Sequence, residues 1–169
     1  MIHNSEFIRK LLHLSNLVIP FTYLFYFDSK VEALIILLPI TLLAFLIEYL
    51  RINSISVKNI FDKYLFSMLR NHEKSGKYTG ATWVFISSTL SIGIFPKDIA
   101  IISLIYMSIG DTAAGLIGRK FGTIKIYNKT LEGALAGFIV CLIVGLMIDL
   151  NLSKTLVTIG ALSAAIIEL

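Results

Sequence analysis

The feature that most constrains the fold of this chain is a series of six apolar runs separated by polar segments. The runs lie at about residues 11–27, 31–50, 80–95, 98–118, 133–150 and 155–169. A helix needs roughly 20 apolar residues to cross the hydrocarbon core of a bilayer, which is about 30 Å thick. Hydrophobic residues make up 56% of the 169 residues, more than a soluble core of this size can bury. We therefore expect an all-α, polytopic membrane helix bundle with about six transmembrane helices, in a single domain over residues 1–169.

The two ends of the chain raise separate questions. Arg9 and Lys10 precede the first apolar run, as in a signal peptide, but no small-residue cleavage site follows and a second run begins almost at once. We interpret the first run as a retained helix. The last run has only about 15 residues, so we expect the C-terminus to be truncated or half inserted.

Lysine and arginine are distributed unequally between the segments that connect the runs. If all six runs cross the membrane, twelve of the 15 Lys and Arg residues lie on one side, and only Lys30, Lys97 and Lys154 lie on the other. The positive-inside rule then places the N-terminus and both long loops in the cytoplasm. Because these cations flank apolar runs and do not form one soluble basic face, we expect no nucleic-acid partner.

The longest polar segment, about residues 51–79, carries apolar residues at helical spacing among lysines and arginines. These apolar residues are Ile55, Ile60, Phe61, Tyr64, Leu65, Met68 and Leu69. The pattern predicts an amphipathic helix that lies at the cytoplasmic interface. Its simplest role is contact with anionic headgroups, and a lid over a headgroup site is the alternative.

Small residues recur at every fourth position in the fourth and fifth runs. The two series are Gly110, Ala114, Gly118 and Gly122, and Gly133, Gly137, Cys141 and Gly145. This spacing lets helix backbones approach closely, within one chain or between the copies of a homo-oligomer. Neither GxGxxG nor GxxxxGK(S/T) occurs, so no Rossmann or P-loop site is indicated. The single cysteine excludes a disulfide framework, and we expect it to be a small packing residue.

Asp111 lies within the fourth run, with Gly115 and Arg119 following at intervals of four. An acid inside a span costs at least about 2.5 kcal/mol on insertion scales, so Asp111 is expected to face the bundle interior or water and to be functional. An ion pair with Arg119 is the structural alternative. Eight residues of helix span about 12 Å, however, which suits a bridging metal ion or phosphate better than direct contact.

Lys129 and Glu132 stand at the start of the fifth run, where Thr130 is a candidate N-cap and Glu132 lies in the first turn. Helix capping alone explains Thr130 and Glu132. A helix N-terminus that bears a lysine, opposite a carboxylate and an arginine, also suits a nucleotide bound with Mg²⁺.

Several short motifs follow one another along the chain. They are Arg9-Lys10-Leu11-Leu12-His13, Glu48 with Arg51, Leu69-Arg70-Asn71-His72-Glu73 before Thr79-Gly80-Ala81-Thr82, Phe95-Pro96-Lys97, Gly110-Asp111, Gly118-Arg119-Lys120-Phe121-Gly122 and Lys129-Thr130-Leu131-Glu132-Gly133. In this order they resemble the integral membrane CTP-dependent lipid kinases, which include dolichol kinase, phytol kinase and yeast-type diacylglycerol kinase. The resemblance spans residues 9–133. Relatives usually continue past a glutamate like Glu168 into an Asp- and Asn-rich segment, which this sequence lacks.

The resemblance implies that a lipid hydroxyl attacks the γ-phosphoryl of CTP, with departure of CDP, at the cytoplasmic face. The acceptor would be a polyprenol, a phytol-like alcohol or diacylglycerol. Under this hypothesis Asp111 and Glu132 are catalytic and hold Mg²⁺ directly or through water. Arg119 and Lys129 bind phosphate oxygens, and Lys120 and Lys125 are weaker candidates for the same role.

The N-terminal motif adds three candidates. Arg9 and His13 share one helix face at i, i+4 spacing, and both, with Lys10, are candidate headgroup or phosphate contacts. His13 is also a candidate general base, with Asp111 as the alternative. Glu48 is expected to pair with Arg51, and the alternative is that it joins the site.

Two other functions compete with the kinase. The block from Gly110 to Gly133 is also similar to phosphatidate cytidylyltransferases, but these are usually longer, and the Arg9 to His13 motif favours the kinase. A small membrane transporter with no enzymatic activity is the second alternative. Transporters commonly show internal repeats and sites at the bilayer midplane, whereas this sequence shows no convincing repeat and its candidate charges gather on one side.

Overall fold

The computed structural model describes residues 4–64, 73 and 76–169. Two of its helices are long and apolar enough to cross a membrane, α3 (Lys30–Asn53) and α7 (Lys97–Phe121). Two shorter apolar helices, α6 (Gly80–Ile94) and α8 (Leu131–Met147), accompany them, and α9 (Lys154–Glu168) follows. The expectation of a predominantly helical fold is confirmed, and the structure is consistent with a helical membrane protein. Six membrane crossings remain a prediction.

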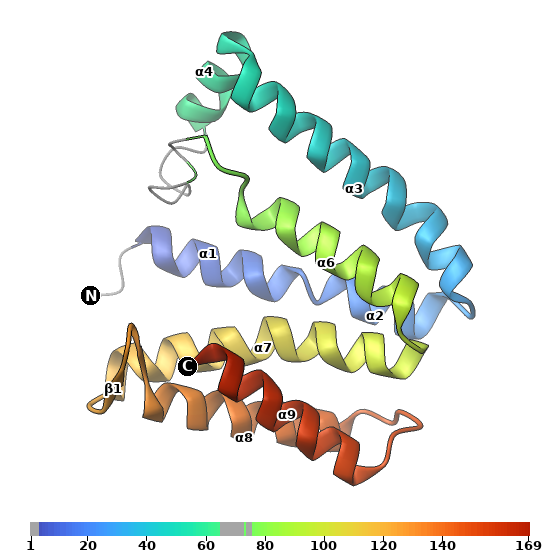
Figure 1. The fold of residues 1–169 in the computed structure, drawn as a ribbon, viewed down its shortest axis with the longest axis vertical. Coiled ribbons are helices and arrows are strands. Elements are labelled where there is room, and N and C mark those ends of the chain that lie inside the picture. Colours follow the sequence, from blue (N-terminus) through green and yellow to red (C-terminus); the bar gives the residue numbers. More distant parts are fainter. Residues whose placement is uncertain (1–3, 65–72, 74–75) are drawn as a thin grey trace. The chain divides into compact units, whose positions relative to one another are not determined.

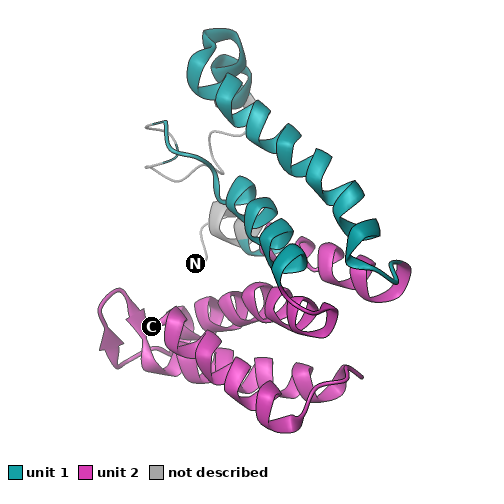
Figure 2. Cartoon of the chain, turned by 45° about the vertical axis from the view of Figure 1, so that its right-hand side comes forward, with its two compact units in different colours: residues 1–11, 27–94 teal, residues 12–26, 95–169 magenta. Residues whose placement is uncertain are grey.

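Contacts group the chain into two compact units, residues 1–11 with 27–94 and residues 12–26 with 95–169 (Figure 2). In the first unit α3 packs against α6 and α4 (Ile55–Tyr64). In the second unit α7 packs against α2 (Val18–Tyr26), α8 and α9, and Figure 1 shows α7, α8 and α9 side by side. The single-domain assignment stays a prediction.

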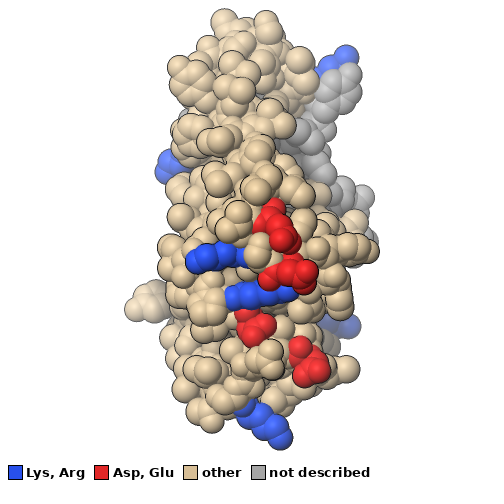
Figure 3. All heavy atoms as spheres, turned by 90° about the vertical axis from the view of Figure 1, so that its right-hand side faces the viewer, with Lys and Arg blue, Asp and Glu red and all other residues tan. Residues whose placement is uncertain are grey.

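The surface of α3 is strongly apolar. Only 17% of its most apolar window is buried, and Ile35, Leu42 and Phe45 are among its exposed large side chains. The face of the molecule drawn in Figure 3 is mostly uncharged, with acidic and basic side chains in a few places. Contiguous apolar surface of this kind marks contact with a membrane or a partner, which supports membrane association.

The first apolar run is not one helix, which corrects the expectation for residues 11–27. It forms the end of α1 (Asn4–Ser15) and then α2, with a tight turn between them. Pro20 has no backbone N–H to donate to the Asn16 carbonyl, and that carbonyl instead accepts from Ile19 at 3.1 Å. Pro39, by contrast, lies inside the continuous helix α3.

A small β-hairpin follows α7, where the sequence was expected to form a loop in an all-α fold. Strands β1 (Lys125–Ile126) and β2 (Lys129–Thr130) pair antiparallel, with Ile126 opposite Lys129. The turn places Tyr127 at φ 53°, a left-handed conformation that is uncommon for residues other than glycine. The hairpin returns the chain directly to the start of α8.

The small-residue series of α7 and α8 face each other, as their spacing predicts. A Cβ atom added to Gly133 would lie 2.7 Å from the Ala114 carbonyl oxygen, and one added to Gly137 would lie 3.3 Å from the Gly110 carbonyl oxygen. Buried Cys141 packs against Gly110. The close backbone approach and the packing role of the cysteine are therefore confirmed.

The expected amphipathic helix is present in part as α4. Within it Ile55 and Ile60 are exposed, whereas Phe61 is half-buried and lies near the Arg51 guanidinium. Leu65, Met68 and Leu69 fall outside the described residues, as do Arg70, Asn71, His72 and Lys74 of the same segment. Contact with headgroups and a lid function both stay predictions.

Candidate active site

A pocket of about 100 Å³ lies in the second unit. Its lining residues come from α7, from the hairpin and from the two helices that follow. They are Ala114, Gly115, Gly118, Arg119, Asn128, Lys129, Thr130, Gly133, Ala134 and Glu168. Pockets for whole small molecules are usually about 300–1,000 Å³. This one therefore suits a single phosphate-sized group, with the rest of any larger ligand outside it.

Glycines permit the close packing around this pocket. A Cβ atom added to Gly118 would lie 2.6 Å from the Thr130 hydroxyl oxygen, so a side chain there would push the hairpin away from α7. Thr130 is the N-cap of α8 and accepts a hydrogen bond from the Gly133 amide at 3.3 Å, which confirms its expected role. The positive end of the α8 dipole is therefore fixed beside the pocket, where it favours an anion.

Of the candidate phosphate ligands, Arg119 and Lys129 both line the pocket. The Arg119 Nε atom donates to the carbonyl oxygen of Gly115 at 2.8 Å, one turn back along α7. The Lys129 ammonium forms an ion pair with the Glu168 carboxylate, in the last turn of α9. The structure thus brings together two cations that lie ten positions apart in the sequence.

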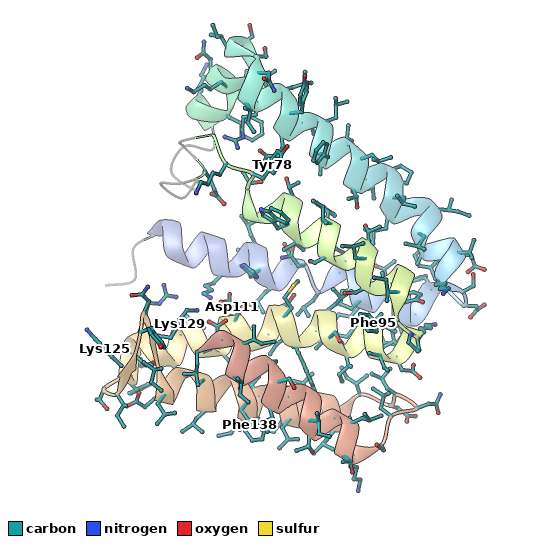
Figure 4. The ribbon with its side chains drawn as sticks, viewed as in Figure 1. Tyr78, Phe95, Asp111, Lys125, Lys129 and Phe138 are labelled. Carbon is teal, nitrogen blue, oxygen red and sulfur yellow. The ribbon has the colours of Figure 1, made fainter. Side chains whose placement is uncertain are left out.

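Lys120 and Lys125 do not line the pocket. The Lys120 Nζ atom lies 5.0 Å from the centre of the neighbouring Phe121 ring. Lys125 is exposed on β1 and points outward from the hairpin (Figure 4). Of the N-terminal candidates, Lys10 is half-buried and belongs to the first unit, and the side chain of Arg9 lies outside the described part of the chain.

Asp111 and His13 are brought together in the second unit. The His13 Nδ1 atom lies 3.9 Å from the Asp111 Oδ2 atom, and each side chain is more than two-thirds buried. Asp111 projects from α7 one turn before Gly115, so it lies near the pocket without lining it (Figure 4). A carboxylate beside an imidazole forms a pair that can take up or hold a proton.

Glu132 lies in the first turn of α8, as expected, and binds the backbone that follows α7. Its Oε1 atom accepts from the Thr123 and Ile124 amides at 2.9 and 3.0 Å and from the Thr123 hydroxyl. Hydrogen bonding, first from the Thr123 hydroxyl and then from the backbone amides of Glu132 itself, Thr123 and Ile124, lowers the pKa of Glu132 to about 2. Glu132 does not line the pocket, so this contact supports the shape of the connection between α7 and the hairpin.

The contacts of Glu132 predict a local effect of its charge. Because the pKa is lowered from 4.5 in the folded state, its stabilising contribution is present above about pH 4.5 and is lost as the pH falls through about 2. We expect Glu132→Gln to accelerate amide hydrogen exchange at Thr123 and Ile124 and to remove this pH dependence. Mass spectrometry of exchange in detergent, with exposed Asp149→Asn as the control, measures both. Unchanged exchange at the two amides would contradict the assignment.

Among residues 4–64, 73 and 76–169, no group of three or more His, Cys, Asp and Glu residues is arranged to hold a metal ion. A divalent cation here would rely on one or two carboxylates and on oxygen atoms of a bound ligand, which is the usual situation for Mg²⁺ with phosphates. Asp111, whose side chain is 26% exposed, offers one such carboxylate near the pocket.

Glu168 is a pocket residue that the sequence did not indicate as functional. In the sequence analysis it served only as the point past which the sequences of relatives usually continue. The partner of its carboxylate, Lys129, is 39 residues away, and neither helical periodicity nor local spacing predicts a contact over such a distance.

Comparison with known proteins finds lipid kinases among the similar sequences. The chain is 31% identical over 145 residues to CTP-dependent diacylglycerol kinase 1 of Saccharomyces cerevisiae, which covers 82% of this chain and 49% of that protein. It is 31% identical over 99 residues to CTP-dependent diacylglycerol kinase 1 of Schizosaccharomyces pombe, covering 57% of this chain and 45% of that protein. The chain is thus similar to CTP-dependent lipid kinases over most of its own length. The resemblance drawn from its motifs is thereby confirmed.

The chain spans about half the length of these two fungal relatives. It is also 24% identical over 166 residues to an uncharacterised protein of Rickettsia prowazekii, covering 95% of this chain and 80% of that protein. No protein-family model and no solved structure matches the chain.

Proposed function

We propose that this chain transfers the γ-phosphoryl group of CTP to the hydroxyl of a membrane lipid alcohol. The observation that carries the proposal is the convergence of Arg119 and Lys129 on a phosphate-sized pocket at the N-terminus of α8. The fungal relatives are named diacylglycerol kinases, so diacylglycerol is the first acceptor to test, ahead of polyprenols and phytol-like alcohols.

Phosphoryl transfer depends on positioning and on neutralising the charge of the phosphates more than on covalent chemistry. Arg119 and Lys129 bind phosphate oxygens, and the α8 N-terminus adds its dipole. Asp111 would contribute a carboxylate to Mg²⁺ bound with the nucleotide, and the cation would supply neutralisation of charge that develops on the phosphates. Glu132 acts indirectly, because it fixes the turn at Thr123 and Ile124 from which the hairpin starts.

The acceptor hydroxyl must lose its proton as its oxygen atom bonds to phosphorus. The structure offers two groups near each other for this role, the His13 imidazole and the Asp111 carboxylate. In our proposal the proton goes to one of them, and the bond from the γ-phosphorus to the bridging oxygen breaks to release CDP. The pH dependence of turnover in a His13→Gln variant distinguishes the two.

We also propose the membrane arrangement that the reaction requires. Six crossings with a cytoplasmic N-terminus would put Arg119, Lys129 and the start of α8 on the cytoplasmic side of the membrane, where CTP is available. The positive-inside distribution of lysine and arginine supports this orientation. The small-residue faces of α7 and α8 pack against each other. A homo-oligomer would therefore have to form through a different surface.

The decisive experiment uses purified protein in lipid bilayers with Mg²⁺ and CTP labelled at the γ- or the α-phosphate. We expect label from the γ position in diacylglycerol or another lipid alcohol. Label from the α position in a lipid formed from phosphatidate would instead assign a cytidylyltransferase. No transfer from either position would contradict an enzymatic function and leave the transporter alternative. A variant with Arg119 and Lys129 both changed to Met is the matched negative control.

A further inference from the structure

The phosphate-sized pocket contains a negative charge as well as two positive ones. Of the described residues that line it, Arg119 and Lys129 are basic and Glu168 is acidic. The Glu168 side chain is only 23% exposed and its carboxylate is paired with the Lys129 ammonium. The one lining carboxylate among the described residues is thus held by a cation that the proposed reaction needs for phosphate.

A carboxylate in such a position opposes the binding of a bare phosphate, because like charges at close range repel each other. It also competes with phosphate for Lys129. A divalent cation reverses this effect, since it attracts carboxylate and phosphate oxygens at the same time. A pocket that contains Glu168 is therefore better suited to a phosphate with its cation than to a phosphate alone.

We propose that Glu168 binds the divalent cation that accompanies the nucleotide triphosphate, and that Lys129 exchanges Glu168 for a phosphate oxygen when the nucleotide enters. This inference rests on the proposed function. An ammonium group can make such an exchange because it is a point charge on a flexible stem, and the Lys129 side chain is about half exposed. Glu168 would then make nucleotide binding depend on Mg²⁺.

The competing explanation is that the Lys129 and Glu168 pair only fastens α9 to the hairpin. In that case the loss of the carboxylate would change stability and would not change the effect of Mg²⁺ on nucleotide binding. The two explanations therefore differ in a binding measurement that requires no turnover.

The test is calorimetric titration of CTP into the full chain in lipid nanodiscs, with and without Mg²⁺. In the wild type we expect Mg²⁺ to tighten CTP binding by about tenfold, a typical coupling between two ligands. In Glu168→Gln we expect this ratio to fall to about threefold or less, because binding of free CTP strengthens and binding of the Mg²⁺ complex weakens, while Asp111 still contributes to holding the cation. Asp149→Asn, which removes an exposed acid between α8 and α9, should keep the wild-type ratio.

A wild-type ratio in Glu168→Gln, with CTP still bound, would overturn the role of Glu168 and leave the proposed function intact. Absence of CTP binding in the wild type with Mg²⁺ would overturn the proposed function and this inference together. If Glu168→Gln does not fold, Glu168→Asp replaces it. That variant keeps the charge on a shorter side chain. We expect Mg²⁺ to tighten its CTP binding by a factor between the wild-type value and one. A factor equal to that of the wild type would contradict the proposed role of Glu168.

Discussion

Replacing Asp111 with Asn is expected to lower CTP-dependent phosphorylation of a lipid alcohol by about a thousandfold or more. Asparagine has nearly the same shape as aspartate, so the packing of α7 should survive. What is lost is the negative charge, which the proposal requires to hold Mg²⁺ or to accept the hydroxyl proton. Transfer of the γ-phosphate label in bilayers measures the effect, and thermal unfolding of the purified variant shows whether the protein is folded.

The matched control for this variant is Asp98→Asn. Asp98 lies in the first turn of the same helix, 13 residues or about 20 Å from Asp111 along its axis. The same change of charge there should leave turnover nearly unchanged. Turnover close to wild type in Asp111→Asn would remove Asp111 from the mechanism. A variant that loses activity and also unfolds at a lower temperature would show that the carboxylate is structural.

The sequence predicted those parts of the fold that follow from short periodicities. The long apolar runs became α3 and α7, and the four-residue repeat of small residues placed α7 against α8 because small side chains let two backbones approach. The break between α1 and α2 depends on how the chain satisfies the Asn16 carbonyl when Pro20 cannot donate to it. The presence of Pro20 indicated a disturbance, but not that it would divide the run.

The hairpin and part of the site could not be predicted in the same way. Strands of two residues carry no alternating pattern, and the turn uses Tyr127 in place of a glycine that would have marked it. The motif order indicated Arg119, Lys129 and Asp111. The contact of Glu132 with the Thr123 and Ile124 amides arises only when the hairpin folds. Sequence spacing therefore indicated candidate residues, of which Arg119 and Lys129 line the pocket, while long-range contacts decided which other side chains line it.

Arg51 in the first unit gives the largest expected effect on stability. Its guanidinium lies 2.7 Å from the Glu48 carboxylate, and both side chains are almost fully buried, so the expected pairing of these residues is confirmed. The same guanidinium donates to the carbonyl oxygens of Glu73 and Lys77 at 3.1 and 2.6 Å. The Glu48 carboxylate also accepts from the hydroxyl of Thr79 at 2.5 Å. This network joins the end of α3 to the segment that leads into α6.

Removing one partner of a buried ion pair leaves the other charge without compensation, which typically costs about 3–5 kcal/mol. We therefore expect Arg51→Met to lower the free energy of unfolding by about that amount, because Glu48 keeps its charge and two backbone carbonyls lose their donor. Equilibrium unfolding in mixed micelles measures the change. Lys58→Met, which removes an exposed cation on α4, is the control and should have little effect.

The double variant Glu48→Gln with Arg51→Met separates the buried charge from the lost hydrogen bonds. With both charges removed, the uncompensated carboxylate no longer exists, so the double variant should be less destabilised than the two single changes predict when added. If the changes are additive, the cost comes from the carbonyls of Glu73 and Lys77 and not from the charge on Glu48. If Arg51→Met unfolds like the Lys58→Met control, the network does not hold α3 to the start of α6, and packing alone must explain their contact.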